Sequence, residues 1–186
     1  MHIQIIVGSI RRGRNALAIA EWAQAVAAEH QEITTEIVDL REWKLPMYDL
    51  PKPPVIGDYE DPLQQRWADQ IARGDGFVFV SPEYNHGYTA VLKNALDYLY
   101  AEWVDKPAGF IAYGVNGGER AIEQLRLVLL ELRMSPLRDA VHIPDLFDFL
   151  EDGRFKGAEH HTRQMHRVFD GLVKWGFGGH DLISRR

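Results

Sequence analysis

The segment 8–15 carries the most concentrated chemistry in the chain. It reads Gly-Ser-Ile-Arg-Arg-Gly-Arg-Asn and lies between a short apolar stretch and an alanine-rich stretch with helical spacing. A hydroxyl, three guanidinium groups, two glycines and the expected start of a helix favour an anion, because backbone N–H groups and forked arginine donors match phosphate oxygens. A solvated basic turn is the alternative, but the position after a strand favours phosphate binding.

The phosphate motifs of the common nucleotide-binding folds are absent from the sequence. Neither G-x-G-x-x-G, the dinucleotide fingerprint, nor G-x-x-x-x-G-K-[ST], the P-loop, occurs. Asp39 ends the second apolar segment, where dinucleotide folds hold a ribose, but without the glycines this signal is weak. A terminal phosphate monoester therefore fits the first loop better than a pyrophosphate.

Two further loops with polar residues and glycines are expected at strand ends. Residues 81–87 read Ser-Pro-Glu-Tyr-Asn-His-Gly, and residues 114–118 read Gly-Val-Asn-Gly-Gly. A rigid rim of proline, aromatic and amide groups suits the edge of a flat heteroaromatic ligand, and glycines let backbone approach a ligand closely. Taken alone, each segment is also compatible with an ordinary turn.

Short apolar runs and helical patterns position these loops. Strands are predicted at 3–7, 34–39, 76–81, 108–113 and 137–143. Helices are predicted at about 16–29, 62–73, 89–100, 119–134 and 158–175. The proline-rich segment 40–62 and the segment 144–157 are expected to be loops. The alternation predicts an α/β fold with a parallel sheet covered on both faces, in which ligands bind beyond the carboxyl ends of the strands.

Length and composition limit the function classes. The 186 residues are expected to form one domain, 1–186, with a mobile Gly-rich tail at 176–186. The net charge of −6 argues against nucleic-acid and anionic-membrane binding, and the absence of cysteine excludes thiolate chemistry. No zinc motif occurs, and His160, His161 and His166 are expected on a solvated helix face. No membrane span or secretion signal is expected, which favours a cytoplasmic location.

Three segments, in the right order, resemble the NADPH-dependent FMN reductase family. They are 8–15 (GSIRRGRN), 81–100 (SPEYNHGYTAVLKNALDYLY) and 113–121 (YGVNGGERA), of which the middle one is the most specific. The resemblance covers most of residues 1–175. It implies a flavodoxin-like three-layer sandwich with a five-stranded parallel sheet in the order 2-1-3-4-5. It also implies FMN as cofactor and NADPH or NADH as hydride donor.

The resemblance assigns each loop a part of FMN. The first loop would hold the phosphate through Ser9, Arg11 and Asn15. Arg14 stands where many members have a small hydroxyl residue, so its role stays open between the FMN phosphate and NADPH. The second loop would lie along the isoalloxazine ring, and the third would approach the pyrimidine edge of that ring. The residues implied are Pro82, Glu83, Tyr84 and Asn85, and then Gly114, Asn116 and Gly117.

The implied activity is hydride transfer from NAD(P)H through FMN to a quinone, a flavin, an azo dye or a similar small acceptor. The flavin supplies this chemistry, so no protein residue is expected to be catalytic, and Glu83 needs no acid–base role. His86 lies beside the expected ring site and is a candidate for substrate contact. The three arginines of the first loop favour NADPH over NADH, because a 2′-phosphate binds arginine, unless FMN uses them all.

Two other function classes fit the same fold. A flavodoxin-type electron carrier would not oxidise NAD(P)H itself, but such carriers have hydroxyl-rich, arginine-poor phosphate loops. A binding module without turnover is disfavoured by the candidate residues in all three loops. The helix at 119–134 has a second apolar stripe, Leu127, Leu130 and Met134, which together with the resemblance predicts a homodimer or homotetramer.

Overall fold

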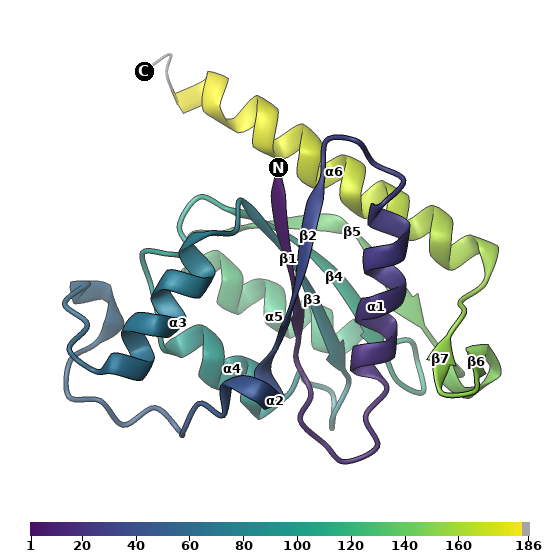
Figure 1. Ribbon diagram of the computed structural model, residues 1–186, viewed down its shortest axis with the longest axis horizontal. Coiled ribbons are helices and arrows are strands. Elements are labelled where there is room, and N and C mark those ends of the chain that lie inside the picture. Colours follow the sequence, from purple (N-terminus) through teal and green to yellow (C-terminus); the bar gives the residue numbers. More distant parts are fainter. Residues whose placement is uncertain (184–186) are drawn as a thin grey trace.

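A five-stranded sheet is the centre of the computed structural model, which describes the backbone of residues 1–183 and the side chains of residues 1–176. Its strand order is β2-β1-β3-β4-β5, and all neighbouring strands are parallel (Figure 1). The strands are β1 (His2–Val7), β2 (Thr34–Asp39), β3 (Gly76–Pro82), β4 (Pro107–Tyr113) and β5 (Ser135–Ile143). The predicted sheet and its strand order are confirmed.

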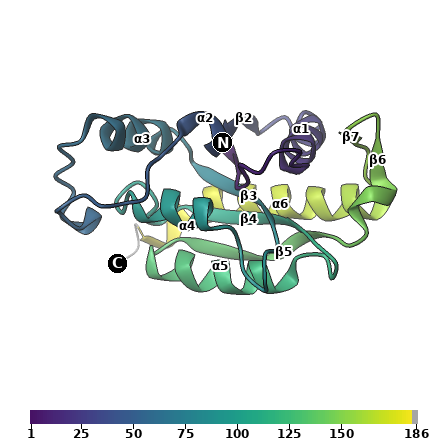
Figure 2. The same ribbon diagram turned by 90° about the horizontal axis from the view of Figure 1, so that it is seen from below.

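Helices cover both faces of the sheet and bury two hydrophobic cores. One face carries α3 (Pro62–Ala72), α4 (Ala90–Asp97) and α5 (Glu119–Glu131). The other carries α1 (Ala16–Ala27) and α6 (Glu159–Ile183) (Figure 2). Along β3, Phe77 and Phe79 face the first core, whereas Val78 and Val80 face the second. Strands buried on both faces must be apolar throughout, and every residue of β3 and β4 is buried.

The segment 40–62, predicted to be a loop, contains regular structure. A short helix, α2 (Leu40–Trp43), begins where the Asp39 carboxylate accepts from a backbone amide, and a 3-10 turn spans Pro54–Ile56. Buried Asn94 on α4 holds the segment, because its Nδ2 donates to the Pro46 carbonyl at 2.7 Å. The prolines indicate a loop, but they do not reveal a partner so far along the chain.

The predicted loop 144–157 and the predicted helix end at 175 are both wrong in detail. The segment contains a 3-10 turn (Leu146–Phe149) and a hairpin of β6 (Leu150–Glu151) and β7 (Arg154–Phe155). Asp152-Gly153, at φ 48° and 74°, forms its turn, a hairpin signal that the apolar pattern does not contain.

Helix α6 continues past the predicted boundary to Ile183, so residues 176–183 of the predicted tail are helical. Extending a formed helix is far easier than starting one, which offsets the low helix propensity of its glycines. Residues 184–186 of the predicted tail lie outside the described residues. No helix within residues 1–183 is both long and apolar enough to cross a membrane.

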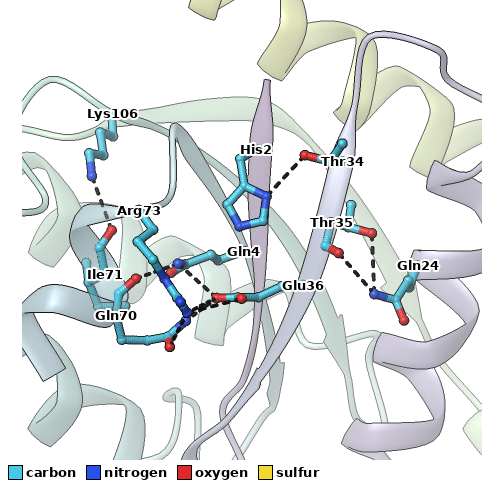
Figure 3. Close-up of polar contacts among 10 residues, drawn as sticks. All are labelled: His2, Gln4, Gln24, Thr34, Thr35, Glu36, Gln70, Ile71, Arg73 and Lys106. Atoms are coloured by element: carbon cyan, nitrogen blue, oxygen red, sulfur yellow. Dashed lines mark hydrogen bonds and ion pairs between the residues drawn. The ribbon is translucent and has the colours of Figure 1, made fainter. Parts of the chain in front are cut away.

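Buried Gln4 on β1 anchors a polar cluster between the sheet and α3 (Figure 3). Its Nε2 donates to the Gln70 carbonyl at 2.6 Å and to Glu36 on β2 at 3.2 Å. Arg73 donates to both carboxylate oxygens of Glu36, at 3.0 and 3.2 Å. These contacts fix β1, β2 and α3 relative to one another, and thereby fix the strand ends from which the loops leave.

His161, in the first turn of α6, is buried among aromatic rings rather than on a solvated face. Its Nδ1 accepts from the Ala158 amide at 2.9 Å, and its ring centroid lies 4.7 Å from that of Phe149, edge to face. Burial lowers the pKa of His161 to about 4, and the adjacent His160 contributes to the lowering. The folded protein therefore favours the neutral imidazole.

We expect a His161→Gln variant to lose less stability in acid than the wild-type protein. Because the unfolded histidine titrates near 6.5 and the folded one near 4, its effect is absent above about pH 6.5 and grows as the pH falls toward 4. The loss is at most about 3.5 kcal/mol, at roughly 1.4 kcal/mol per pKa unit. The glutamine side chain of the variant does not titrate and keeps an acceptor for the Ala158 amide.

Urea unfolding at about pH 7 and about pH 4.5 measures this difference, since it gives the free energy of unfolding of both proteins. Other histidines affect both proteins alike, so the comparison isolates His161. Equal acid sensitivity of the two proteins would contradict the prediction.

Candidate functional site

The three polar loops lie side by side at the carboxyl edge of the sheet. Val7 at the end of β1 pairs with Val80 on β3, and Pro82 at the end of β3 pairs with Tyr113 at the end of β4. Strand β1 has β2 on one side and β3 on the other, so the strand order reverses there. Ligands of open α/β sheets bind at such a point. The candidate site consists of the loops 8–15, 83–89 and 114–118.

Gly8 starts the first loop in a space too small for a side chain. Its amide donates to the Val80 carbonyl at 2.8 Å, and a Cβ would lie 2.9 Å from that oxygen and 3.2 Å from Leu92 Cδ2. Thr89, the N-cap of α4, donates its hydroxyl to the Gly8 carbonyl. The first loop therefore leaves the sheet at a fixed point between β3 and α4.

Ser9 and Asn15 present hydrogen-bonding groups that the described residues do not use. Ser9 is 1% exposed, and its hydroxyl lies near the Tyr113 phenol but makes no hydrogen bond of normal geometry within residues 1–176. Asn15 is the N-cap of α1, but its side chain accepts from no helix amide, and the first turn contains no acidic residue. A buried hydroxyl without a partner, beside an uncapped helix N-terminus, fits an anion such as the FMN phosphate.

The three arginines of the first loop occupy two different environments. Arg11 and Arg12 are exposed, and the Arg11 guanidinium carbon lies 5.9 Å from the centroid of the Tyr84 ring, a cation–π distance. Arg14 turns inward, where both Nη atoms donate to the Asp39 carboxylate and Nη1 also donates to the Ser9 carbonyl. The fold thus separates side chains that the sequence places together.

The second loop contains a tight turn. The Tyr84 amide donates to the Gly87 carbonyl at 2.8 Å, and the Gly87 amide donates to the Tyr84 carbonyl at 3.0 Å. Between them, Asn85 and His86 have φ of 50° and 71°, the left-handed pair of a type I′ turn, whose second position usually holds glycine. Gln124 on α5 donates to the His86 carbonyl at 2.7 Å and holds the turn. Tyr84, Asn85 and His86 are exposed at its tip.

The third loop depends on glycine. The Gly117 amide donates to the Gly114 carbonyl at 2.9 Å, and Gly117 and Gly118 have φ of 73° and 77°. A Cβ on Gly118 would lie 2.5 Å from Ala112 Cβ, so this position has no room for another residue. Gly118 is also the N-cap of α5, so the loop presents backbone at a helix start.

Arg120 joins the second loop to the third, although the sequence did not single it out. Its Nη1 donates to Glu83 Oε1 at 2.9 Å, and its amide donates to Glu83 Oε2 at 3.2 Å. With its amide oxygen turned toward Arg120, Asn116 accepts from both Nη atoms at 3.1 and 3.2 Å. A cation in the first turn of a helix interacts unfavourably with the helix dipole. The position of Arg120 at the predicted helix start was therefore the one sequence signal that this residue needs a partner.

Tyr113, at the end of β4, is a second residue that the sequence did not single out. Burial raises the pKa of Tyr113, and nearby Tyr84 raises it further, while Arg11 and the neighbouring Ser9 hydroxyl lower it in part. The phenol therefore stays protonated at neutral pH and keeps its hydrogen-bond donor within the candidate site.

The family model for NADPH-dependent FMN reductases matches residues 1–148, which contain all three loops. The chain belongs to this family. The resemblance inferred from the three segments is therefore confirmed. Membership makes the protein an NAD(P)H-dependent oxidoreductase with FMN as cofactor.

Relatives of this chain carry names consistent with the family. An NAD(P)H-dependent FMN reductase of Schizosaccharomyces pombe is 41% identical over 146 residues, covering 76% of this chain and 73% of the relative. An FMN-dependent NADPH-azoreductase of Staphylococcus saprophyticus is 30% identical over 171 residues, covering 89% of each chain. The solved structure of FerB, a flavoenzyme NAD(P)H:(acceptor) oxidoreductase from Paracoccus denitrificans, has a TM-score of 0.74 at 24% identity, covers 95% of this chain and 97% of its own, and supports the flavodoxin-like fold.

The fold brings the predicted site residues of all three loops to one edge, but it gives several of them other partners. Arg14 is bound to Asp39, Glu83 is bound to Arg120, and Pro82 is buried at the end of β3. The predicted residues that lie in the loops without such an ion pair are Ser9, Arg11, Asn15, Tyr84, Asn85, Gly114, Asn116 and Gly117.

Gly118→Ala is expected to lower the free energy of unfolding by about 2–4 kcal/mol. The left-handed φ costs about 1 kcal/mol, and a Cβ 2.5 Å from Ala112 Cβ and 2.8 Å from the Tyr113 amide nitrogen forces the backbone to move. Gly153→Ala is the matched control, because its φ is 74° but nothing lies within 4 Å of the new Cβ. Urea unfolding should show only about 1 kcal/mol for the control. Equal losses would mean that the third loop can relax around a side chain.

Proposed function

We propose that this protein binds FMN at the carboxyl edge of its sheet and uses it to transfer hydride from NAD(P)H to a small acceptor. The main support is the Ser9 hydroxyl, which is buried and has no hydrogen-bond partner among the described residues. It lies beside the uncapped N-terminus of α1 in a member of the FMN reductase family. When bound, FMN accepts hydride and passes the electrons on. The protein supplies position and electrostatics, and no side chain is proposed to be catalytic.

The first loop is proposed to hold the FMN phosphate. Ser9 would donate its hydroxyl, Asn15 its amide and Arg11 its guanidinium, and the first backbone amides of α1 would complete the set of donors. Arg12, which is exposed beside Arg11, is proposed to favour NADPH over NADH by attracting the 2′-phosphate.

The second and third loops are proposed to hold the isoalloxazine ring. The bordering residues would be Pro82, Glu83, Tyr84 and Asn85 on one side, and Gly114, Asn116 and Gly117 at the pyrimidine edge. The Glu83 carboxylate is 10% exposed and paired with Arg120, which supports a role in fixing the loop rather than in acid–base chemistry. Exposed His86 would contact the substrate.

Flat, two-electron acceptors are the proposed substrates: quinones, flavins and azo compounds. The loops expose apolar and aromatic surface, with Val115 at 90% and Tyr84 at 38% exposure. Such groups bind a flat aromatic molecule by stacking and shape rather than by ion pairing. The name of the relative from Staphylococcus saprophyticus, an FMN-dependent NADPH-azoreductase, agrees with this class.

A homodimer or homotetramer is proposed to form through α5. Leu125 and Leu129 are buried in the core, whereas Leu127 and Leu130 on the same helix are 69% and 57% exposed. Met134, predicted to belong to the exposed stripe, is 3% exposed and belongs to the core instead. Two neighbouring exposed leucines support a contact with a second copy.

A single domain over residues 1–186 and a cytoplasmic location are also proposed. The helices of the described chain pack against the two faces of one five-stranded sheet, which supports a single folding unit. The cytoplasm supplies the NAD(P)H that the reaction consumes.

The purified protein, incubated with FMN and desalted, is expected to retain a yellow chromophore that bleaches with NADPH under anaerobic conditions. The visible absorption spectrum measures both properties. A retained chromophore that does not bleach would contradict the oxidoreductase and indicate a flavodoxin-type carrier. A protein that retains no flavin would contradict tight binding.

Ser9→Ala, which removes the unpartnered hydroxyl, should weaken FMN binding roughly tenfold.

Leu127→Glu is expected to shift the protein from an oligomer to a monomer, because a carboxylate in an apolar contact would be desolvated without a partner. Light scattering after size-exclusion chromatography measures the mass. Val55→Glu is the matched control, since Val55 is 60% exposed but lies on the segment 40–62 rather than on α5. A wild-type monomer at working concentration would contradict the oligomer.

A further inference from the structure

Arg14 and Asp39 form a buried ion pair between the first loop and the end of β2. Their side chains are 6% and 13% exposed. The guanidinium is bidentate: Nη1 donates to Asp39 Oδ1 at 2.7 Å, and Nη2 donates to Oδ2. The same Nη1 donates to the Ser9 carbonyl at 2.5 Å. Both Nη atoms of Arg14 are therefore bound inside the protein.

We infer that Arg14 is a positioning residue: with Asp39 it fixes the backbone of the first loop, and it does not itself bind the FMN phosphate. This inference rests on the proposed function, because it concerns the loop that would hold that phosphate. It resolves the role of the residue that stands where the family often has a small hydroxyl side chain.

The first loop is held at its two ends and at Ser9. Its start is held by the contacts of Gly8 with Val80 and Thr89, and its end is the first turn of α1. Between them, the bond from Arg14 to the Ser9 carbonyl is the single side-chain bond to the loop backbone within the described residues. This bond fixes the peptide of Ser9, whose buried hydroxyl has no partner in the described chain.

The charge of Asp39 also favours a positioning role for Arg14. An arginine drawn away to a ligand would leave the Asp39 carboxylate buried without its partner, which is strongly unfavourable. Asp39 Oδ1 also accepts from the Arg41 amide at 3.0 Å and so starts α2. The carboxylate therefore orders two segments at once. It is also occupied at the position where dinucleotide folds bind a ribose, which agrees with a mononucleotide ligand.

The two possible roles of Arg14 predict opposite effects of an Asp39 substitution on FMN affinity. Removing Asp39 makes the site more positive and releases Arg14, so a phosphate-binding Arg14 would bind FMN as well or better. If Arg14 instead positions the loop, removing Asp39 should weaken FMN binding as removing Arg14 does. The phosphate also distinguishes the roles, because a defect confined to the first loop should affect FMN and spare riboflavin, which lacks the phosphate.

The experiment measures dissociation constants of FMN and riboflavin by quenching of flavin fluorescence, with the full-length apoprotein. We expect Arg14→Ala and Asp39→Ala each to weaken FMN binding about tenfold or more, and the double variant to be no weaker than the single ones, as coupled residues require. Riboflavin binding should change less than about twofold. Arg41→Ala is the control for the loss of one positive charge, because the Arg41 side chain is exposed and only its backbone amide contacts Asp39, and it should leave FMN binding within about twofold.

Unchanged or tighter FMN binding by Asp39→Ala, with a loss in Arg14→Ala, would overturn the inference and make Arg14 a phosphate ligand. Equal losses for FMN and riboflavin would also overturn it, because the pair would then support the whole fold. Arg14→Lys and Asp39→Asn carry the same test if the alanine variants unfold, with the same selective loss for FMN expected. A wild-type protein that binds no FMN would instead refute the proposed function, and the inference with it.

Discussion

Burial of the central strands on both faces is the constraint on which the rest of the structure depends. A parallel sheet has all its carboxyl ends at the same edge, and helices must cover both faces to keep its apolar side chains from water. The backbone groups at the strand ends still need hydrogen-bond partners. The Gly8 amide donates to the Val80 carbonyl, and the Glu83 amide donates to the Tyr113 carbonyl. The candidate site is therefore assembled by the same hydrogen bonds that end the sheet.

Charge in the candidate site is divided between internal pairs and the surface. Both well-buried carboxylates, Asp39 and Glu83, are matched by arginines, Arg14 and Arg120, because an unpaired buried charge is strongly unfavourable. Those pairs leave little net charge inside. The exposed guanidinium groups of Arg11 and Arg12 stand beside the loop that would hold a phosphate. A protein with a net charge of −6 can thus present a locally positive site to anionic ligands.

The loops of the site are rigid for different physical reasons. The third loop is held by glycines at left-handed φ, of which Gly118 has no room for a Cβ. The second loop instead holds His86, a residue with a side chain, at φ 71°, and Gln124 on α5 braces its carbonyl. Such backbone strain concentrates at functional sites, where the surrounding structure imposes a conformation that the local sequence does not favour.

Local properties of the chain, namely periodicity, turn residues and loop motifs, were enough to predict most elements, the fold class and the family. They also predicted which segments would meet, since parallel strands bring their carboxyl ends to one edge. The partners that the side chains choose became known only from the folded chain: Arg14 with Asp39, Arg120 with Glu83, and Asn94 with Pro46. The sequence contains many carboxylates that could pair with each arginine, and the packing of distant segments determines which one lies within reach. For the same reason His161 was expected on a solvated face but is buried against Phe149, which belongs to a segment predicted to be a loop.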